Sequence, residues 1–362
     1  MATKPHSKNV ATTRVAMIAI KVLLLPFLVH AIGRHLRAHL GIQLEDEAGA
    51  TTGGANATQV TSSPQNTFAA ESLAGKALEL AARSLAPPSQ STLALLREES
   101  DWKNNLILGL CLPPSVDFES WPRFMKSWAR NFVAGLSLYL IVGGLWAAVC
   151  YGPLKKAFYG NTPTPSGVDM AKQIWVSLQA MPLYTALPAV CEAIVERGYT
   201  LVYPRVDDFG VGAFVLFFVV YLTSVEFGVY WMHRSLHDVK SAYGLLHKTH
   251  HIYNKEHTLS PFAGLAFNPL DGILQAVPYV WSLFFIPTHY LTHELLLFGT
   301  AIWTTNIHDC IDGAYEPIMG AGYHLLHHTN YRTNYGHYLT YCDRIFGSLE
   351  VPKREIPAKK TM

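Results

Sequence analysis

Eight histidines form three short clusters in the second half of the chain, and their spacing is typical of metal ligands. They are His233 and His237, then His247, His250 and His251, and finally His324, His327 and His328. Spacings of three and four residues place side chains on one face of a helix, so each cluster can present several imidazoles to a shared centre. Neutral imidazole binds iron, zinc and copper well. Because a closed zinc site normally needs only four ligands, eight imidazoles predict a centre with two metal ions.

The composition favours a membrane protein. The chain has 362 residues, of which 50% are hydrophobic and only 15% are charged, whereas soluble domains carry about 25% charged residues. This hydrophobicity excludes an intrinsically disordered chain. The formal net charge of +2 gives no electrostatic footprint for nucleic acid, which we therefore do not expect as a partner.

Two other kinds of site are not indicated. The five cysteines are scattered and contain no C-x-x-C pair, which argues against a disulfide framework and against a thiolate metal site. Gly210 and Gly212 lie in an apolar run and lack the rest of a dinucleotide-binding fingerprint. We therefore expect no built-in NAD(P)H site.

The three histidine clusters can form one site only if the apolar segments between them bring them together on the same side of the membrane. The segments that we expect to form membrane helices are 131–151, 173–196, 210–231, and a tight hairpin of 267–287 and 290–307. Pro182 and Pro188 predict that the second of them is kinked or re-entrant. The hairpin returns the chain to the side it left, so all three clusters can meet. The expected fold is an all-α, polytopic membrane bundle with a histidine-rich di-metal cap.

The ends of the chain differ in composition from the rest. Residues 1–44 contain no acid and hold an apolar stretch at 15–33; a signal anchor, a cleaved presequence and a surface helix all fit, and we favour the anchor. Residues 45–100 read as a low-complexity linker with one short helix near 70–84, before a membrane domain at 101–352. Residues 353–362 end in K-K-T-M, which resembles a dilysine retrieval signal. That signal predicts the endoplasmic reticulum membrane, with the C-terminus and the histidines cytosolic.

Around the histidines the chain resembles the fatty acid hydroxylase/sterol desaturase superfamily, and within it the plant-like Δ7-sterol C-5(6)-desaturases (lathosterol oxidases). The resemblance covers about residues 120–350. The segments that carry it are V-E-F-G-V-Y-W-M-H-R-S-L-H (225–237), H-K-T-H-H-I-Y-N-K (247–255), L-S-P-F-A-G-L-A-F-N-P-L-D-G (259–272), N-I-H-D-C-I-D-G (306–313) and M-G-A-G-Y-H-L-L-H-H-T-N-Y-R-T-N-Y-G-H-Y (319–338).

This resemblance implies a function. Two non-haem irons held by the three histidine clusters at the cytosolic face would activate O2 and take hydrogens from C-5 and C-6 of a Δ7 sterol in the membrane lipid. Electrons would come from NAD(P)H through a reductase and cytochrome b5. His308, in the N-I-H-D-C-I-D-G segment (306–313), is implied as a further ligand.

Two positions depart from the family pattern. Asn268 stands where the family's F-H-P-x-D-G has histidine, and Asp312 stands where the plant-like H-D-x-x-H-G has another. Asp312 could still bind iron as a carboxylate. These departures put full activity in doubt. They leave open a degenerate, non-catalytic member, beside a sterol C-4 methyl oxidase or another di-iron lipid hydroxylase of the same superfamily.

Three acids are expected to support the ligands. Glu226 precedes His233 by seven residues, hence lies on the same helical face, and could orient that imidazole by accepting its N–H. Asp238 and Asp309 directly follow histidines of the predicted centre. We expect these three carboxylates to lie directly behind the metal-binding histidines and to orient them.

Overall fold

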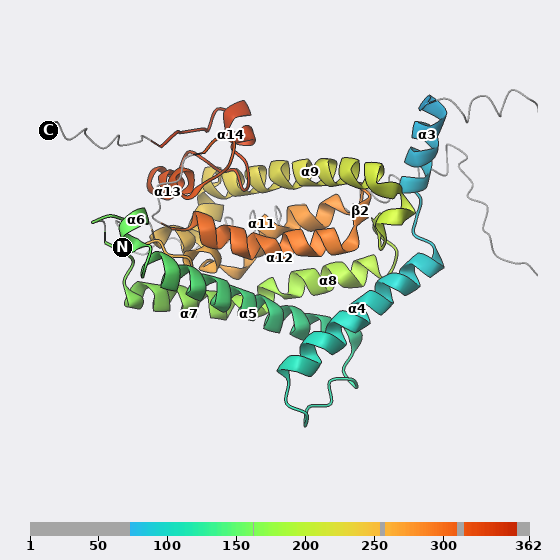
Figure 1. Cartoon of the computed structure of the whole chain (residues 1–362). Coiled ribbons are helices and arrows are strands. Elements are labelled where there is room, and N and C mark those ends of the chain that lie inside the picture. The colour runs from blue at the N-terminus through green and yellow to red at the C-terminus, as the bar shows by residue number, and fades with distance from the viewer. Residues whose placement is uncertain (1–72, 162, 254–257, 310–314, 353–362) are drawn as a thin grey trace, which may run out of the picture.

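The computed structural model describes residues 73–161, 163–253, 258–309 and 315–352, and this part is almost entirely helical (Figure 1). The longer helices are α3 (Leu73–Ser84), α4 (Gln90–Cys111), α5 (Arg123–Cys150), α7 (Gly167–Tyr184), α8 (Ala186–Val195), α9 (Gly210–Asp238), α11 (Pro269–Ser282), α12 (Tyr290–Ile307) and α13 (Ala321–Asn330). The short helices and helical turns are α6 (Lys155–Phe158), η1 (Val206–Asp208), α10 (Lys240–Ala242), η2 (Tyr243–His247), η3 (His250–Ile252), η4 (Ala263–Leu265) and α14 (Tyr341–Ile345). The predicted helical bundle is confirmed.

Three helical segments are long and apolar enough to cross a membrane. They are Arg123–Cys150, Gly167–Val195 and Gly210–Asp238, and they coincide with three of the predicted spans. The second is broken between α7 and α8, because Pro188 has no N–H to donate to the carbonyl four residues earlier. The Thr185 hydroxyl at the break donates to the Met181 carbonyl at 3.0 Å. The predicted kink is therefore confirmed.

The predicted hairpin is present, but its first arm is shorter than expected. Helix α11 has 14 residues, about 21 Å at 1.5 Å per residue, whereas a hydrocarbon core is about 30 Å thick. Neither α11 nor α12 is among the three spans of the described residues. At the turn, β2 (Thr288–His289) pairs in parallel with β1 (Val202–Tyr203), with Val202 opposite Thr288. The hairpin lies between α9 and α5 and returns the chain to the end where α9 finishes (Figure 1).

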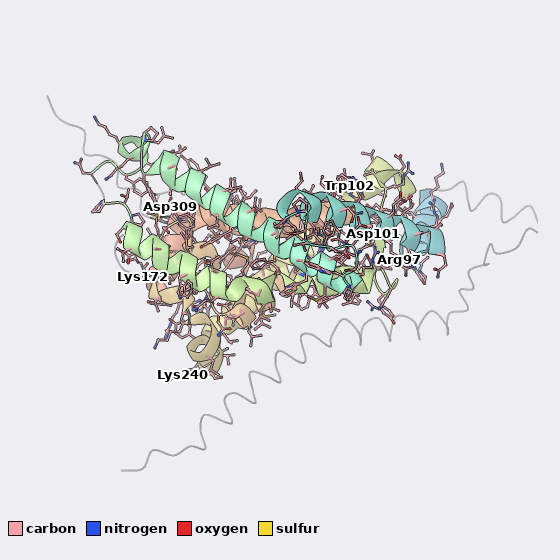
Figure 2. All side chains as sticks on the ribbon, turned by 90° about the horizontal axis from the view of Figure 1, so that it is seen from below. Arg97, Asp101, Trp102, Lys172, Lys240 and Asp309 are labelled. Atoms are coloured by element: carbon pink, nitrogen blue, oxygen red, sulfur yellow. The ribbon has the colours of Figure 1, made fainter. Side chains whose placement is uncertain are left out.

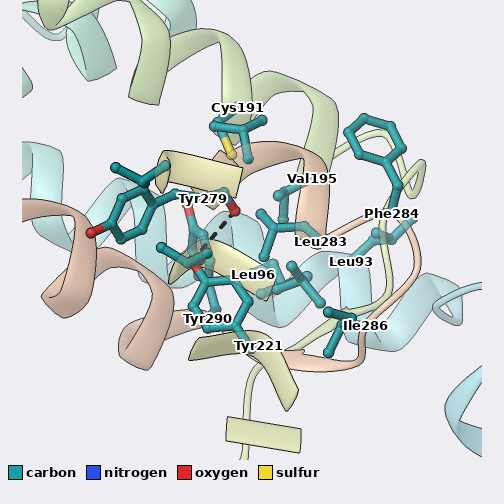
Figure 3. Packing of buried hydrophobic residues seen from close by; sticks show 14 residues of the cluster. Leu93, Leu96, Cys191, Val195, Tyr221, Tyr279, Leu283, Phe284, Ile286 and Tyr290 are labelled. Carbon is teal, nitrogen blue, oxygen red and sulfur yellow. Dashed lines mark hydrogen bonds between the residues drawn. The ribbon is translucent and has the colours of Figure 1, made fainter. Parts of the chain in front are cut away.

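The largest hydrophobic cluster lies away from the histidines and joins α4, α8, α9, α11 and α12 (Figure 3). Its fully buried members include Leu96, Tyr221, Tyr279, Leu283 and Tyr290. Leu93 and Leu96 of α4 belong to it, so the packed unit starts before residue 101. The linker prediction for 45–100 is wrong for residues 90–100, while the short helix expected near 70–84 is α3. The predicted signal anchor and the dilysine-like tail lie outside the described residues.

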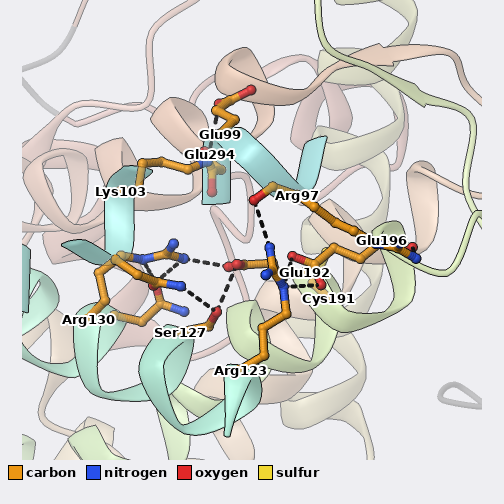
Figure 4. A network of polar contacts seen from close by, with 12 residues as sticks. Arg97, Glu99, Lys103, Arg123, Ser127, Arg130, Cys191, Glu192, Glu196 and Glu294 are labelled. Atoms are coloured by element: carbon orange, nitrogen blue, oxygen red, sulfur yellow. Dashed lines mark hydrogen bonds and ion pairs between the residues drawn. The ribbon is translucent and has the colours of Figure 1, made fainter. Parts of the chain in front are cut away.

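One buried and one half-buried ion pair hold together the end of the bundle that α4 crosses (Figure 4). Arg130 of α5 pairs with Glu192 of α8 at 2.5 Å, and Lys103 of α4 pairs with Glu294 of α12 at 2.5 Å. Viewed from below, Asp101 of α4 lies toward this end, whereas Lys240 and Asp309 lie toward the other (Figure 2). A charge that loses its partner inside such a bundle is costly. The Lys103–Glu294 pair therefore holds α4 against α12, and the Arg130–Glu192 pair holds α5 against α8.

Helices α9 and α11 pack tightly against each other at Gly228, which generates a test of the packing. A Cβ atom at Gly228 would lie 2.6 Å from Cβ of Pro278 and 2.8 Å from Cζ2 of Trp281, whereas one at Gly212 of the same helix would meet nothing within 4 Å. Overpacking costs about 1–3 kcal/mol. Gly228→Ala should therefore lower the melting temperature of the detergent-solubilised protein, and Gly212→Ala should leave it unchanged or raise it. Equal melting temperatures for the two variants would contradict this close packing.

Candidate metal centre

Nine buried or half-buried histidines gather at one end of the bundle and divide into two groups. Site A contains His233, His237, His247, His251 and His327, and site B contains His250, His308, His324 and His328. Within each site, one nitrogen from every residue lies within 4.8 Å of all the others. The structure thus brings together all eight histidines of the three clusters and His308.

Five separate parts of the chain supply these side chains. The last two turns of α9 carry His233 and His237, and α13 carries the third cluster. The second cluster lies on the turns η2 and η3, where the irregular backbone directs His247 and His251 into site A but His250 into site B. His308 follows the last residue of α12. The hairpin α11–α12 therefore brings His308 within reach of the second and third clusters, whose members complete site B.

The Nε2 atoms within each site face one another at short range. In site A, the Nε2 of His251 lies 3.1 Å from that of His247 and 3.2 Å from that of His327. In site B, the Nε2 of His308 lies 3.1 Å from that of His250 and 2.8 Å from that of His324. Two nitrogens bound at right angles to one ion at about 2.1 Å are about 3.0 Å apart. Each group therefore fits one metal ion.

Four of the imidazoles are held in a defined tautomer by their Nδ1 atoms. Carbonyl oxygens accept from Nδ1 of His233 (Tyr335, 3.1 Å), of His308 (Thr304, 2.9 Å) and of His327 (Thr333, 2.8 Å). A carbonyl cannot donate, so Nδ1 carries the proton and Nε2 of the neutral ring keeps its lone pair. Hydrogen bonds of this kind orient metal ligands in proteins.

The fourth of these partners is a carboxylate that the sequence reasoning missed. Asp271 and His247 are both fully buried, and Oδ2 of Asp271 lies 2.7 Å from Nδ1 of His247. Leu270 and Asp271 follow Pro269 in the first turn of α11, whose N-cap is Asn268. A signal was available, because Asp271 is the one acid within residues 259–287. An acid in such an apolar stretch usually serves a site.

Burial keeps six of the imidazoles outside the spans uncharged. Burial lowers the pKa of five of these rings well below the ordinary value for histidine, and the neighbouring imidazoles lower the pKa further. The five are His250, His251, His324, His327 and His328. Burial lowers the pKa of His308 to about 4, although the Thr304 carbonyl partly offsets the effect. Neutral imidazoles have a lone pair free for a metal, so binding there needs no proton release from these rings.

The three acids expected behind the ligands have other partners. Seven residues, two helical turns, put Glu226 about 10 Å along the axis from His233, which is beyond hydrogen-bond reach. Its carboxylate instead accepts the backbone N–H groups of Tyr338 (2.8 Å) and Leu339 (3.2 Å). The prediction that Glu226 orients His233 is therefore wrong: Glu226 fixes the loop after α13.

Asp238 and Asp309 also differ from the expectation. The side chain of Asp238 is 61% exposed and pairs with Arg234 at 3.3 Å, so Asp238 faces outward from site A. Asp309 is buried and accepts hydrogen bonds from Trp146 Nε1 at 2.6 Å and from the Tyr159 hydroxyl. Those bonds attach the segment after His308 to α5 and to the chain beyond it.

Of the two departures from the family pattern, one has a structural explanation. Oδ1 of Asn268 accepts the N–H of Leu270 at 2.9 Å, and its Nδ2 donates to the carbonyl of Leu245 at 3.4 Å. Asn268 thus serves as the N-cap of α11, the helix that carries Asp271. Asp312 lies outside the described residues.

An apolar cavity adjoins both sites. Four histidines of the centre form part of its wall: His233, His250, His308 and His324. Away from them, the cavity extends between α8, α9, α11 and α12, along side chains such as Leu187, Val229, Ile273, Leu297 and Phe298. A lipid-soluble molecule in this cavity would contact the metal centre directly.

Comparisons with known proteins agree with this picture. The sequence model for "Fatty acid hydroxylase" matches residues 218–348. The chain is 49% identical over 267 residues to a Delta(7)-sterol-C5(6)-desaturase of Nicotiana tabacum, covering 73% of this chain and 96% of the relative. It is 49% identical to the putative Delta(7)-sterol-C5(6)-desaturase 2 of Arabidopsis thaliana, over 71% of this chain and 92% of the relative. It is 35% identical to lathosterol oxidase of Homo sapiens, over 51% of this chain and 62% of the relative. No solved structure matches the chain.

The Asp271–His247 bond generates a prediction about metal binding. Asp271→Asn exchanges the carboxylate for an amide of the same shape, and the loss of such an outer partner typically weakens metal affinity by about 10- to 100-fold. We expect a purified Asp271→Asn protein to lose metal from site A in a chelator titration at correspondingly lower chelator concentration. Asp238→Asn is the matched control and should titrate like the parent. Identical titrations for the parent and Asp271→Asn would contradict the role given to Asp271.

Proposed function

This chain belongs to the family of Δ7-sterol C5(6)-desaturases, and we propose that it introduces the C5=C6 double bond into a Δ7 sterol in sterol biosynthesis. It is a membrane oxidoreductase with a non-haem di-iron type of centre. The single observation that carries the proposal is the apolar cavity whose wall includes histidines of both sites. A rigid, apolar substrate can enter it from the membrane with its reacting carbons beside the metal ligands.

We propose that the histidines of each site bind one iron. Site A would hold one iron through His233, His237, His247, His251 and His327, and site B would hold the other through His250, His308, His324 and His328. Imidazole-rich sites suit iron. Bound there, the two irons would supply the redox chemistry that O2 activation requires.

The overall reaction balances as a four-electron reduction of O2. The sterol loses one hydrogen from C5 and one from C6, which provides two electrons and two protons as the double bond forms. An external donor supplies two more electrons, two protons come from water, and both oxygen atoms leave as water. The apolar walls of the cavity keep bulk water from the substrate, and the Nδ1 partners keep the ligating rings in place during turnover.

We propose cytochrome b5, with its NAD(P)H-dependent reductase, as the electron donor. The sequence contains no dinucleotide fingerprint, which supports an external supply. A polar cleft lined by Arg234, His237, Tyr331 and Arg332 reaches site A from the outside, and His237 is half-buried there. An electron carrier bound over this cleft would lie next to a ligand of site A.

We also propose a location and a domain division. The K-K-T-M end supports the endoplasmic reticulum membrane, with the histidine centre and the C-terminus on the cytosolic side. The desaturase domain would extend from α4 to about residue 352 and would include residues 218–348, which match the family model. Residues 1–44 would form an N-terminal signal anchor.

Sterol profiling tests the function. Expressed in cells that lack their own C5(6)-desaturase, the chain should convert the accumulated Δ7 sterol into a Δ5,7 sterol, detected by mass spectrometry. His250→Ala removes a ligand of site B and should abolish the product without changing the amount of protein. His289→Ala is the control, since His289 lies on β2 at the far end of the hairpin, and it should keep the activity. A hydroxylated or C4-demethylated sterol in place of the Δ5,7 product would contradict the proposal.

A further inference from the structure

A tenth histidine lies in the cavity wall and belongs to neither site. His337 lines the cavity together with His308 and His324, and its Nε2 is buried with no hydrogen-bond partner. It is not a member of site A or site B. A buried polar atom without a partner is destabilising, which points to a ligand that supplies the missing hydrogen bond.

The other polar groups of this wall are already engaged. The hydroxyls of Tyr279 and Thr300 bond to each other at 2.7 Å, and each bonds to Tyr338. The Gln275 amide donates to Asp271 at 2.8 Å, and the Thr304 hydroxyl donates to the Ala301 carbonyl. Apart from histidines of the two sites, Nε2 of His337 is the one buried, unpartnered side-chain atom among the described residues of this wall.

The backbone of His337 is held firmly. Its carbonyl accepts the Nε1–H of Trp303 at 2.7 Å, and the next two N–H groups bind the carboxylate of Glu226. Glu226 of α9 and Trp303 of α12 thus fix the position of His337 relative to these two helices of the cavity wall. A hydrogen bond from such a group orients its ligand, because little freedom is lost when the bond forms.

A Δ7 sterol has one group that would meet this atom. The sterol is apolar except for its 3β-hydroxyl group, which is attached to C3. A single carbon atom separates C3 from C5. When C5 and C6 lie beside the histidines of site B, the hydroxyl must therefore lie close to them too. A hydroxyl can either donate to an imidazole nitrogen or accept from it, so it can satisfy either tautomer of His337.

We propose that Nε2 of His337 binds the 3β-hydroxyl of the sterol and thereby sets which ring carbons face the metal centre. The inference rests on the proposed function, since it assigns a substrate contact within the same cavity. It makes His337 a specificity-determining residue that recognises a free hydroxyl on ring A. The hydroxyl supplies the hydrogen bond that the wall leaves open.

Two variants and two substrates test this contact. The metal-loaded, purified enzyme with its electron donor would be assayed on a Δ7 sterol and on the 3-deoxy analogue of the same sterol. His337→Leu should lower kcat/KM for the 3β-hydroxy sterol by about tenfold or more. For the 3-deoxy sterol, His337→Leu should match the parent. His337→Gln, whose amide can bind a hydroxyl, should recover much of the activity on the natural substrate.

Iron content separates this role from metal binding. All three proteins should contain the same iron per chain. Equal losses on both substrates, unchanged kinetics of His337→Leu on the hydroxy sterol, or a drop in iron content would each overturn the inference. A parent enzyme that desaturates neither sterol would instead refute the proposed function, on which this inference rests.

Discussion

The rest of this structure depends on the burial of nine imidazoles at one end of a membrane bundle. Buried polar nitrogens are costly unless each has a partner. Hydrogen bonds satisfy Nδ1 of His233, His247, His308 and His327. The facing Nε2 atoms of each site have no polar group between them that could serve all of them at once, and a metal ion can. Residues distant in the sequence, from α9 to the loop after α13, are arranged around this requirement.

One end of the bundle stabilises the packing of the helices, and the other end holds the metal-binding histidines. The far end is fixed by a large apolar cluster and by buried ion pairs such as Arg130–Glu192 (Figures 3 and 4). The near end holds the histidines and opens into the cavity. Because the far end holds the helices together, the near end can keep a cavity beside the centre. Gly228, where α9 and α11 meet, lets those two helices pack closely against each other.

The sequence predicted the metal-binding histidines better than the residues that hold them in place, for a physical reason. Local spacing groups the histidines into three clusters, so the clusters could be found without a fold, although the split of the second cluster between the two sites could not. The assignment of Glu226 failed because the same spacing ignores distance along the axis. Asp271 reaches His247 from a different helix, and no local pattern specifies that pairing. Leu93 and Leu96 lie in a stretch whose composition resembles a linker, but their packing places them in the core.

The central claim is that sites A and B each hold one iron through imidazole nitrogens. X-ray absorption at the iron edge, combined with metal analysis of the purified full-length protein, measures this directly. The account predicts two irons per chain, each with a first shell of nitrogen or oxygen atoms at about 2.0–2.2 Å, by analogy with metal–imidazole distances, and with the multiple-scattering signature of histidine rings. One iron per chain, or a shell without that signature, would contradict it.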